Sequence, residues 1–153
     1  MIRTCILIGI IVALNSELKA QVLIKKLSDQ NLCAIDAEFM KNGYALAFSN
    51  MSSEQYVFKG SEEAFKKCWT NLLYELNHYM QQKGIKVHAN ATCYNRIYFN
   101  SDGKIAAYLY ALEGFEATQE KKFDDYLFEF LIAQQLKITS TQNYWQYGVL
   151  KFQ

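Results

Sequence analysis

The segment from Cys93 to Leu112 has the clearest pattern of hydrophobic and polar positions in the chain. Two runs rich in aromatic and apolar residues flank the turn residues 100–103, an arrangement typical of a β-hairpin. In the first run Arg96 and Tyr98 alternate with apolar residues, and the second run alternates in the same way. Gly103 can take the positive φ that such a turn needs. We therefore expect two antiparallel strands joined at residues 100–103.

A helix is predicted before this hairpin. Ser61 suits the N-cap position, and the acidic residues at 62 and 63 favour the positive end of a helix dipole. Gly84 is placed to end the helix. Between these signals the apolar residues recur at helical spacing and form one stripe: Phe65, Trp69, Leu72, Leu73, Leu76 and Met80.

A second helix and a last strand are predicted after the hairpin. Thr118 can cap the helix, which has its own apolar stripe at Phe123, Leu127, Phe130 and Leu131. Residues 134–143 are polar and read as a connection, and residues 144–152 are rich in aromatic and branched residues, as strands are. From residue 61 the predicted order is therefore helix, strand, strand, helix, strand.

Residues 21–60 have a weaker pattern. Residues 21–31 fit either a short helix or an irregular lead-in, and partial alternation favours strands at residues 34–40, 44–48 and 55–58. At 153 residues, one domain is expected. The predicted fold is α+β: an antiparallel β-sheet of three to six strands with two amphipathic helices on one face, spanning residues 21–153.

The N-terminal segment has the pattern of a secretory signal peptide. Arg3 precedes an apolar run, residues 5–14, that is too short to anchor the chain in a bilayer. We expect cleavage after Ala20 and an exported protein, periplasmic or extracellular, with no membrane anchor. Losing residues 1–20 removes two of 16 basic and one of 15 acidic residues and leaves no net charge. Nucleic acid is therefore not an expected partner, because it needs a basic excess.

Candidate catalytic chemistry is scarce. The histidines, His78 and His88, have no evident nucleophile and orienting group beside them, and no phosphate-binding or zinc-binding motif occurs. After cleavage the remaining cysteines are Cys33, Cys68 and Cys93, whose spacing is not that of a zinc site. We interpret them as small hydrophobes, with one disulfide possible in an exported protein. No enzyme activity, cofactor or metal is expected.

Tyrosines on the hairpin are candidate binding residues. Tyr and Arg are enriched at protein interfaces because they bring a large rigid area with a polar tip. The alternative is that residues 21–60 cover these side chains and make them part of the core. The candidates, expected to share one face of the sheet, are Tyr94, Arg96, Tyr98, Tyr108 and Tyr110.

Residues 91–152 resemble the C-terminal domain of TonB proteins. The resemblance rests on the segment from Arg96 to Ile105, which is similar to the family's strand–Asp-Gly–strand hairpin, and on the order of elements around it. The segment ending near Ala20 is similar to export signals of Bacteroidetes proteins. The resemblance implies a non-enzymatic module that binds a protein partner by adding a strand to the free edge of its last strand. The partner-binding positions it indicates are Tyr147, Val149 and Lys151.

A second function class stays open. The chain can instead be a small secreted ligand-binding protein or enzyme with a pocket between helices and sheet. The residues expected to line that pocket are Phe65, Trp69, Tyr98 and Phe130. A pocket ligand would raise the melting temperature by mass action.

Overall fold

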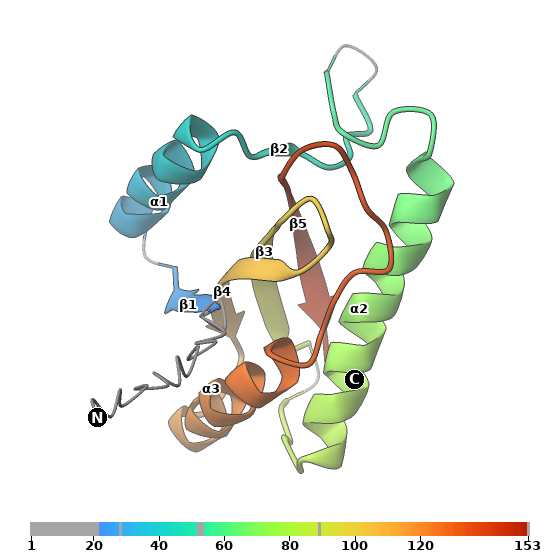
Figure 1. Cartoon of the computed structure of the whole chain (residues 1–153). Coiled ribbons are helices and arrows are strands. Elements are labelled where there is room, and N and C mark those ends of the chain that lie inside the picture. The colour runs from blue at the N-terminus through green and yellow to red at the C-terminus, as the bar shows by residue number, and fades with distance from the viewer. Residues whose placement is uncertain (1–21, 28, 52–53, 89, 153) are drawn as a thin grey trace, which may run out of the picture.

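The computed structural model describes residues 22–27, 29–51, 54–88 and 90–152. The expected signal peptide, residues 1–20, lies outside them. The α+β prediction is confirmed, with five strands and three helices (Figure 1). In chain order the elements are β1 (Leu23–Lys26), α1 (Asp29–Lys41), β2 (Ala45–Leu46), α2 (Glu62–Gln82), β3 (Thr92–Phe99), β4 (Ile105–Glu113), α3 (Ala117–Leu131) and β5 (Tyr144–Lys151).

One mixed sheet holds all five strands, in the order β1-β4-β3-β5-β2. The central three strands are antiparallel, as predicted, with Tyr94 between Ala111 of β4 and Val149 of β5. The two outer strands are parallel to their neighbours, so the expectation of an all-antiparallel sheet is wrong at both edges. Both outer strands come from residues 21–60, and neither is joined to its neighbour in the sheet by a short turn. Antiparallel pairing is therefore not imposed on them.

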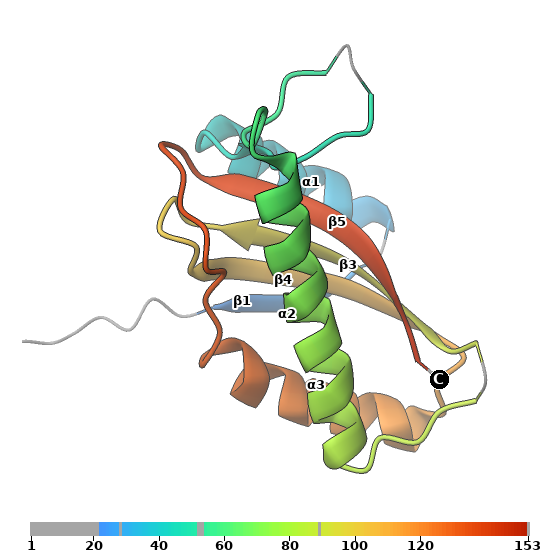
Figure 2. The ribbon, with the colours of Figure 1, turned by 90° about the vertical axis from the view of Figure 1, so that its right-hand side faces the viewer.

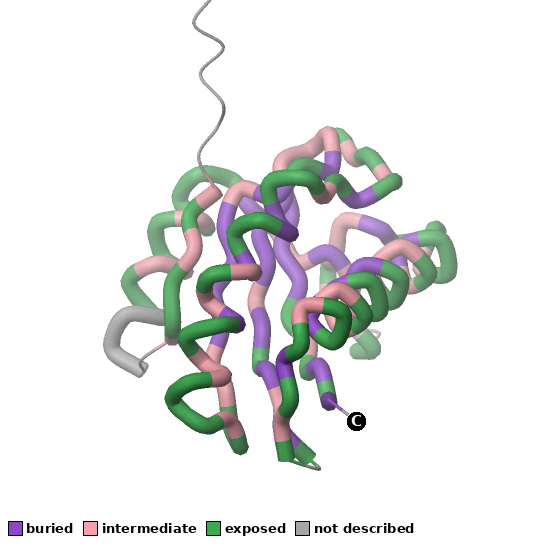
Figure 3. The backbone as a smooth tube through the Cα atoms, turned by 90° about the horizontal axis from the view of Figure 1, so that it is seen from below, coloured by how far each residue is buried: buried purple, intermediate pink, exposed green. Residues whose placement is uncertain are grey.

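The sheet is covered on both faces. Helices α2 and α3 lie on one face, as predicted for two amphipathic helices, and α1 lies on the other (Figure 1). The larger core lies under α2 and α3 and includes Phe65, Leu76 and Phe123. A smaller cluster lies under α1, where Phe39 stacks on Tyr98 with ring centroids 3.9 Å apart. Seen from below, buried positions concentrate in the strands between these helices (Figure 3).

The predicted helices begin and end close to their sequence signals. Ser61 is the N-cap of α2, although its side chain makes no capping hydrogen bond, and Gly84 follows the helix with φ +77°. Helix α3, the second of the two predicted helices, starts two residues earlier than expected, with Glu116 as its N-cap in place of Thr118. The hairpin turn is closed by the Gly103 amide, which donates to the Asn100 carbonyl oxygen at 2.8 Å.

Residues 21–60 differ most from the prediction. Residues 34–40 belong to helix α1 and not to a strand, because Ile35 and Phe39 are four residues apart and contact the sheet from one side of a helix. The strand expected at 44–48 shortens to two residues, and no strand forms at residues 55–58, where 55–56 are irregular and 57–60 form a turn. The segment 21–31, expected to be a short helix or irregular, contains strand β1. Short apolar stretches fit either period, and the choice is made by which partner surface is available.

Cys93 lies fully buried under the α2 and α3 side of the sheet, beside Tyr108. Burial raises the pKa of its thiol to about 12. The unfolded thiol loses its proton near pH 8.5, so the folded state retains a proton that the unfolded state releases as the pH rises. The thiol's contribution to stability is therefore complete below about pH 8.5 and is lost between there and about pH 12.

We expect the free energy of unfolding to fall by about 2 kcal/mol between pH 8 and pH 10.5 through this thiol. The measurement is urea unfolding across that range for the wild type and Cys93→Ala. Tyrosines also ionise there, so the difference between the two proteins isolates the thiol. Equal pH slopes for both proteins would show that Cys93 does not retain its proton.

Candidate functional site

The second half of β5 is an open sheet edge. On one side β5 pairs with β3 along its whole length, whereas on the other side β2 pairs only with Tyr144 and Trp145. The final backbone hydrogen bond between β2 and β5 runs from the Ala47 amide to the Trp145 carbonyl oxygen, at 2.8 Å. The free edge expected along the last strand is thus reduced to residues 147–151. Figure 2 shows this half of β5 extending past helix α2.

Alternation fixes which backbone groups point outward. The carbonyl oxygens of Asn143 and Trp145 face β2, because they accept from β2 amides, whereas the Phe152 amide donates to Ala91 on the β3 side. In an antiparallel pair the N–H and C=O groups of successive residues point to alternate sides. The amide and carbonyl groups of residues 147, 149 and 151 therefore point away from β3. Of these groups, the Tyr147 carbonyl oxygen accepts from Nε2 of Gln146 at 3.4 Å.

A side chain ends the pairing of β2. The Phe48 amide donates to Oε1 of Gln146 at 3.1 Å, and Nε2 of the same side chain donates to the Tyr147 carbonyl oxygen at 3.4 Å. Gln146 is buried, with 7% of its surface exposed. After Phe48 the chain leaves the edge, and Val57 and Phe58 return to donate to the outer side of β2. The Gln146 amide thus marks where the covered part of β5 stops.

Six of the eight predicted site residues share one face of the sheet. Cross-strand pairing places Tyr94 beside Val149 and Arg96 beside Tyr147, and opposed residues of neighbouring strands point to the same face. The six are Tyr94, Arg96, Tyr98, Tyr147, Val149 and Lys151. They lie on the α1 face, and the backbone groups of the last three also form the open edge.

Helix α1 covers only part of this face. Tyr98 is buried beneath it, so for this tyrosine the expectation of coverage by residues 21–60 is confirmed. Tyr94, Tyr147 and Val149 stay 40%, 59% and 48% exposed, and we call these three the β5 patch. Lys151 is exposed as well and has no ion pair within the part of the chain that the structure describes. The patch and the open edge are therefore adjacent.

Asp36 of α1 anchors the covered part. Its carboxylate accepts from Nη1 of Arg96 and from the hydroxyl of Tyr98. The Arg96 guanidinium also lies over the Trp145 ring, 4.6 Å from the centroid. Burial, with the Asp36 carboxylate as a second cause, raises the pKa of Tyr98. This cluster uses Arg96 and Tyr98 to hold α1 on the sheet, so neither is available as a free interface side chain.

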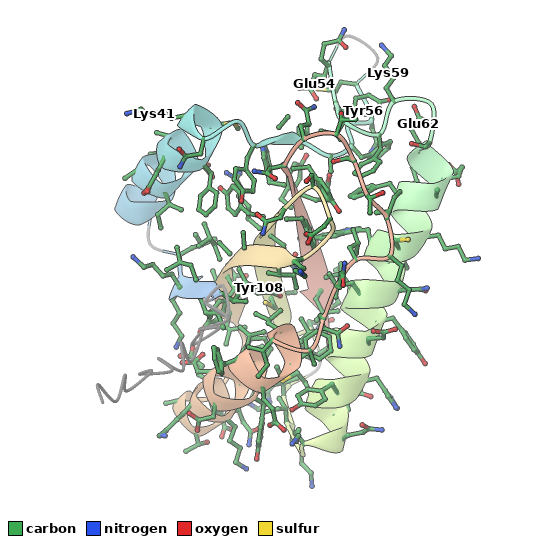
Figure 4. All side chains as sticks on the ribbon, in the orientation of Figure 1. Lys41, Glu54, Tyr56, Lys59, Glu62 and Tyr108 are labelled. Carbon is green, nitrogen blue, oxygen red and sulfur yellow. The ribbon has the colours of Figure 1, made fainter. Side chains whose placement is uncertain are left out.

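Tyr108 and Tyr110 are on the wrong face for the predicted site. They oppose Ile97 and Asn95, which point towards α2 and α3, and both tyrosines are buried there. Figure 4 shows Tyr108 in the interior, whereas Lys41, Glu54 and Lys59 lie at the periphery. Tyr98 pairs with residue 107 and Phe99 with residue 105, so residue 106 of β4 has no partner on β3. This extra residue reverses the faces to which the following β4 side chains point, relative to β3. The sequence-based assignment missed this shift.

The residues predicted to line a pocket between helices and sheet do not line a common pocket. Phe65 and Phe130 are core residues under α2 and α3, and Tyr98 lies on the opposite face of the sheet. A shallow groove of about 590 Å³ lies elsewhere, between α2, the hairpin turn and the α3–β5 connection. Cys68 lies in it and donates to the Lys137 carbonyl oxygen at 3.7 Å. The groove lining is Cys68, Asn71, Leu72, Glu75, Asp102 and residues 133–139.

No cluster of three or more potential metal ligands occurs among the residues that the structure describes. The described cysteines are unpaired: Cys33 is exposed, Cys68 half-buried and Cys93 buried. Among the same residues, no helix has the length and apolarity needed to cross a membrane. The candidate site is thus a surface of backbone groups and tyrosines.

The sequence analysis does not identify Asp36 and Gln146, or Gly148, which lies on the open half of β5 opposite Asn95. The sequence pattern predicts a strand at Asp36, whereas in the structure Asp36 belongs to helix α1 together with Ile35 and Phe39. Gly148 carries a signal, since a glycine inside a strand often marks a close approach. Comparison of the chain with protein-family models, with curated proteins and with solved structures gives no match.

Proposed function

We propose that this protein is an exported, non-enzymatic protein-binding module resembling a TonB C-terminal domain, which captures a partner strand on the open edge of β5. The observation that carries the proposal is the row of outward backbone groups at residues 147, 149 and 151. A partner strand pairing there satisfies these groups, and backbone hydrogen bonds then provide affinity whatever the partner's sequence.

The surroundings of the edge support this function. Unprotected edges invite pairing with other chains, and proteins usually cover them. Here β2 covers two residues and then leaves. The β5 patch adds apolar and aromatic area next to the edge, of the kind enriched at interfaces. The order α2, β3, β4, α3, β5 agrees with the order that the resemblance implies.

Val149→Pro tests strand addition. The Val149 amide points away from β3, so proline removes an outward donor without breaking a bond of the sheet. We expect a folded variant that binds its partner at least tenfold more weakly, because one hydrogen bond is lost and the proline ring occupies the edge. The matched control is Val149→Ala, which trims the side chain and keeps the amide.

The measurement is partner capture by the mature wild type and both variants from an extract of the organism that makes the protein. A protein retained by the wild type and Val149→Ala but lost with Val149→Pro supports strand addition. Thermal unfolding of each variant confirms that it is folded. Unchanged capture by folded Val149→Pro contradicts the proposal.

A further inference from the structure

Gly148 is the one strand position on the open edge without a side chain, and it faces helix α2. A Cβ built there would lie 2.9 Å from Cζ2 of Trp69, so the indole ring lies directly against the Gly148 backbone. Real Cβ atoms essentially never approach so closely. Any larger residue at this position would displace the Trp69 ring, which fills the space where a side chain of β5 would stand.

Packing on the α2 side holds the Trp69 ring in place. It stacks with Phe65 and meets Phe99 edge-on, with ring centroids 6.4 Å apart in both pairs. Trp69 nevertheless remains only half-buried. One and two turns further along α2, Leu73 and Asn77 continue the same line of half-buried side chains. The half-buried ring thus lies over a residue of β5 at a level where β5 is the outermost strand of the sheet.

We propose that Gly148 and Trp69 form the position at which this edge selects its partner: the partner residue opposite Gly148 carries a large apolar side chain. The inference rests on the proposed strand addition and names the chemistry that the edge accepts. Residues directly opposed on neighbouring strands point to the same face, with Cβ atoms about 5 Å apart. A partner side chain opposite Gly148 therefore meets no side chain on β5 and lies against the Trp69 ring.

The Trp69 ring and Leu150 make this position largely apolar, and the side-chain amide of Gln146 is already hydrogen-bonded to the Phe48 amide and the Tyr147 carbonyl oxygen. Gln146 and Leu150, the neighbours of Gly148 on the same face, are buried, with 7% and 8% of their surfaces exposed. A partner leucine or phenylalanine opposite Gly148 covers the Trp69 ring and removes its remaining apolar surface from water. A partner serine is too small to cover that surface, and a partner aspartate would lose its own hydration there. On the opposite face of the sheet Tyr147 and Val149 are exposed, so we expect little selection among the partner side chains that lie beside them.

Blocked synthetic peptides test the selection directly. The probes are Ac-Thr-Thr-Thr-X-Thr-Thr-Thr-NH2 with X as Leu, Phe, Ser or Asp, so that each peptide favours an extended strand and differs at one residue. We expect the Leu and Phe peptides to bind the wild type about tenfold more tightly than the Ser and Asp peptides, as judged by Kd. Changing the ligand cannot unfold the protein.

Two variants and one spectroscopic signal locate the contact. Gly148→Ala displaces the Trp69 ring and is expected to reduce the Leu-to-Ser ratio to about one. The control Lys41→Ala, at an exposed position outside the proposed edge, leaves the ratio unchanged. The chain contains two tryptophans, so Trp145→Phe leaves Trp69 as the sole indole. In that protein the Leu peptide shifts the emission to shorter wavelength by covering the ring.

The outcomes separate this inference from the proposed function. Equal affinity for all four peptides, weakened in each case by Val149→Pro, overturns the selective position and leaves strand addition standing. A Leu preference that survives Gly148→Ala also overturns it. If no peptide binds the wild type more tightly than it binds Val149→Pro, strand addition fails as well.

Discussion

Replacing Gly103 by alanine is expected to lower the free energy of unfolding by about 3 kcal/mol or more. Two effects add. Gly103 has φ +87°, a conformation that costs an alanine about 1 to 2 kcal/mol. In addition, a Cβ would lie 2.2 Å from the Leu136 carbonyl oxygen and 3.0 Å from that of Ile138. Those oxygens belong to the backbone of the α3–β5 connection, so the connection must move.

Movement of the connection breaks further bonds. The Leu136 amide donates to the Gly103 carbonyl oxygen at 2.9 Å, and the Ser140 amide donates to that of Ser101 at 2.9 Å. Both bonds join the hairpin turn to the segment that leads into β5. A displaced turn therefore loosens the start of the strand that carries the candidate edge.

Gly60→Ala is the matched control for this prediction. Gly60 has φ +89°, nearly the same backbone conformation, but a Cβ there meets no atom within 4 Å. We expect this variant to lose only the conformational part, about 1 kcal/mol. Urea unfolding of the two variants separates strain from contact. Equal losses in both would mean that the close approach to Leu136 contributes nothing.

Asp36→Ala is expected to cost about 2 to 3 kcal/mol and to release helix α1 from the sheet. The carboxylate is the partner of both Arg96 and the Tyr98 hydroxyl. Without it a guanidinium and a phenol are left largely buried and unpaired, which costs more than the pair itself contributes. The side chains of Asp36 and Arg96 are only 23% and 21% exposed, so solvent screens this pair less than a surface pair.

A double-mutant cycle isolates the pair. Arg96→Met keeps apolar contact with Trp145 and removes the charge, so Asp36→Ala with Arg96→Met is expected to be more stable than the sum of the two single changes predicts. Glu38→Ala is the control on the same helix, because Glu38 is exposed, and it should change stability by less than about 0.5 kcal/mol. Hydrogen exchange follows the amides of α1. Additivity of the two single changes would contradict a coupled pair.

Release of α1 also has a consequence for the binding surface. Phe39 stacks on Tyr98, and this cluster adjoins the β5 patch. Losing the helix would extend the exposed apolar area around Trp145 and Tyr98, while the backbone groups of residues 147–151 keep their direction. Asp36→Ala is therefore expected to change self-association more than strand capture.

Residues 61–152 show how much local sequence signals determine. The alternation around the Asp102-Gly103 turn, the Ser61 and Gly84 signals and the apolar stripes of α2 and α3 specify these elements, because each depends on neighbours in the chain. Their antiparallel pairing follows from the short connection between β3 and β4. The candidate positions 147, 149 and 151 follow from the resemblance to the TonB C-terminal domain together with the strand predicted at residues 144–152.

Only the tertiary structure decided the rest. Residues 34–40 form a helix because the uncovered sheet face offered Tyr98 and Arg96 as partners for Phe39 and Asp36, and no local pattern encodes that surface. An irregularity of one residue in β4 moved Tyr108 and Tyr110 into the core, since a shift by one position reverses every side chain after it. The length of the open edge likewise depended on where β2 stops. The hydrophobic periodicity of the sequence determines most of the helices and strands. Which sheet face a side chain occupies, and which sheet edge stays open, is set by contacts between residues far apart in the chain.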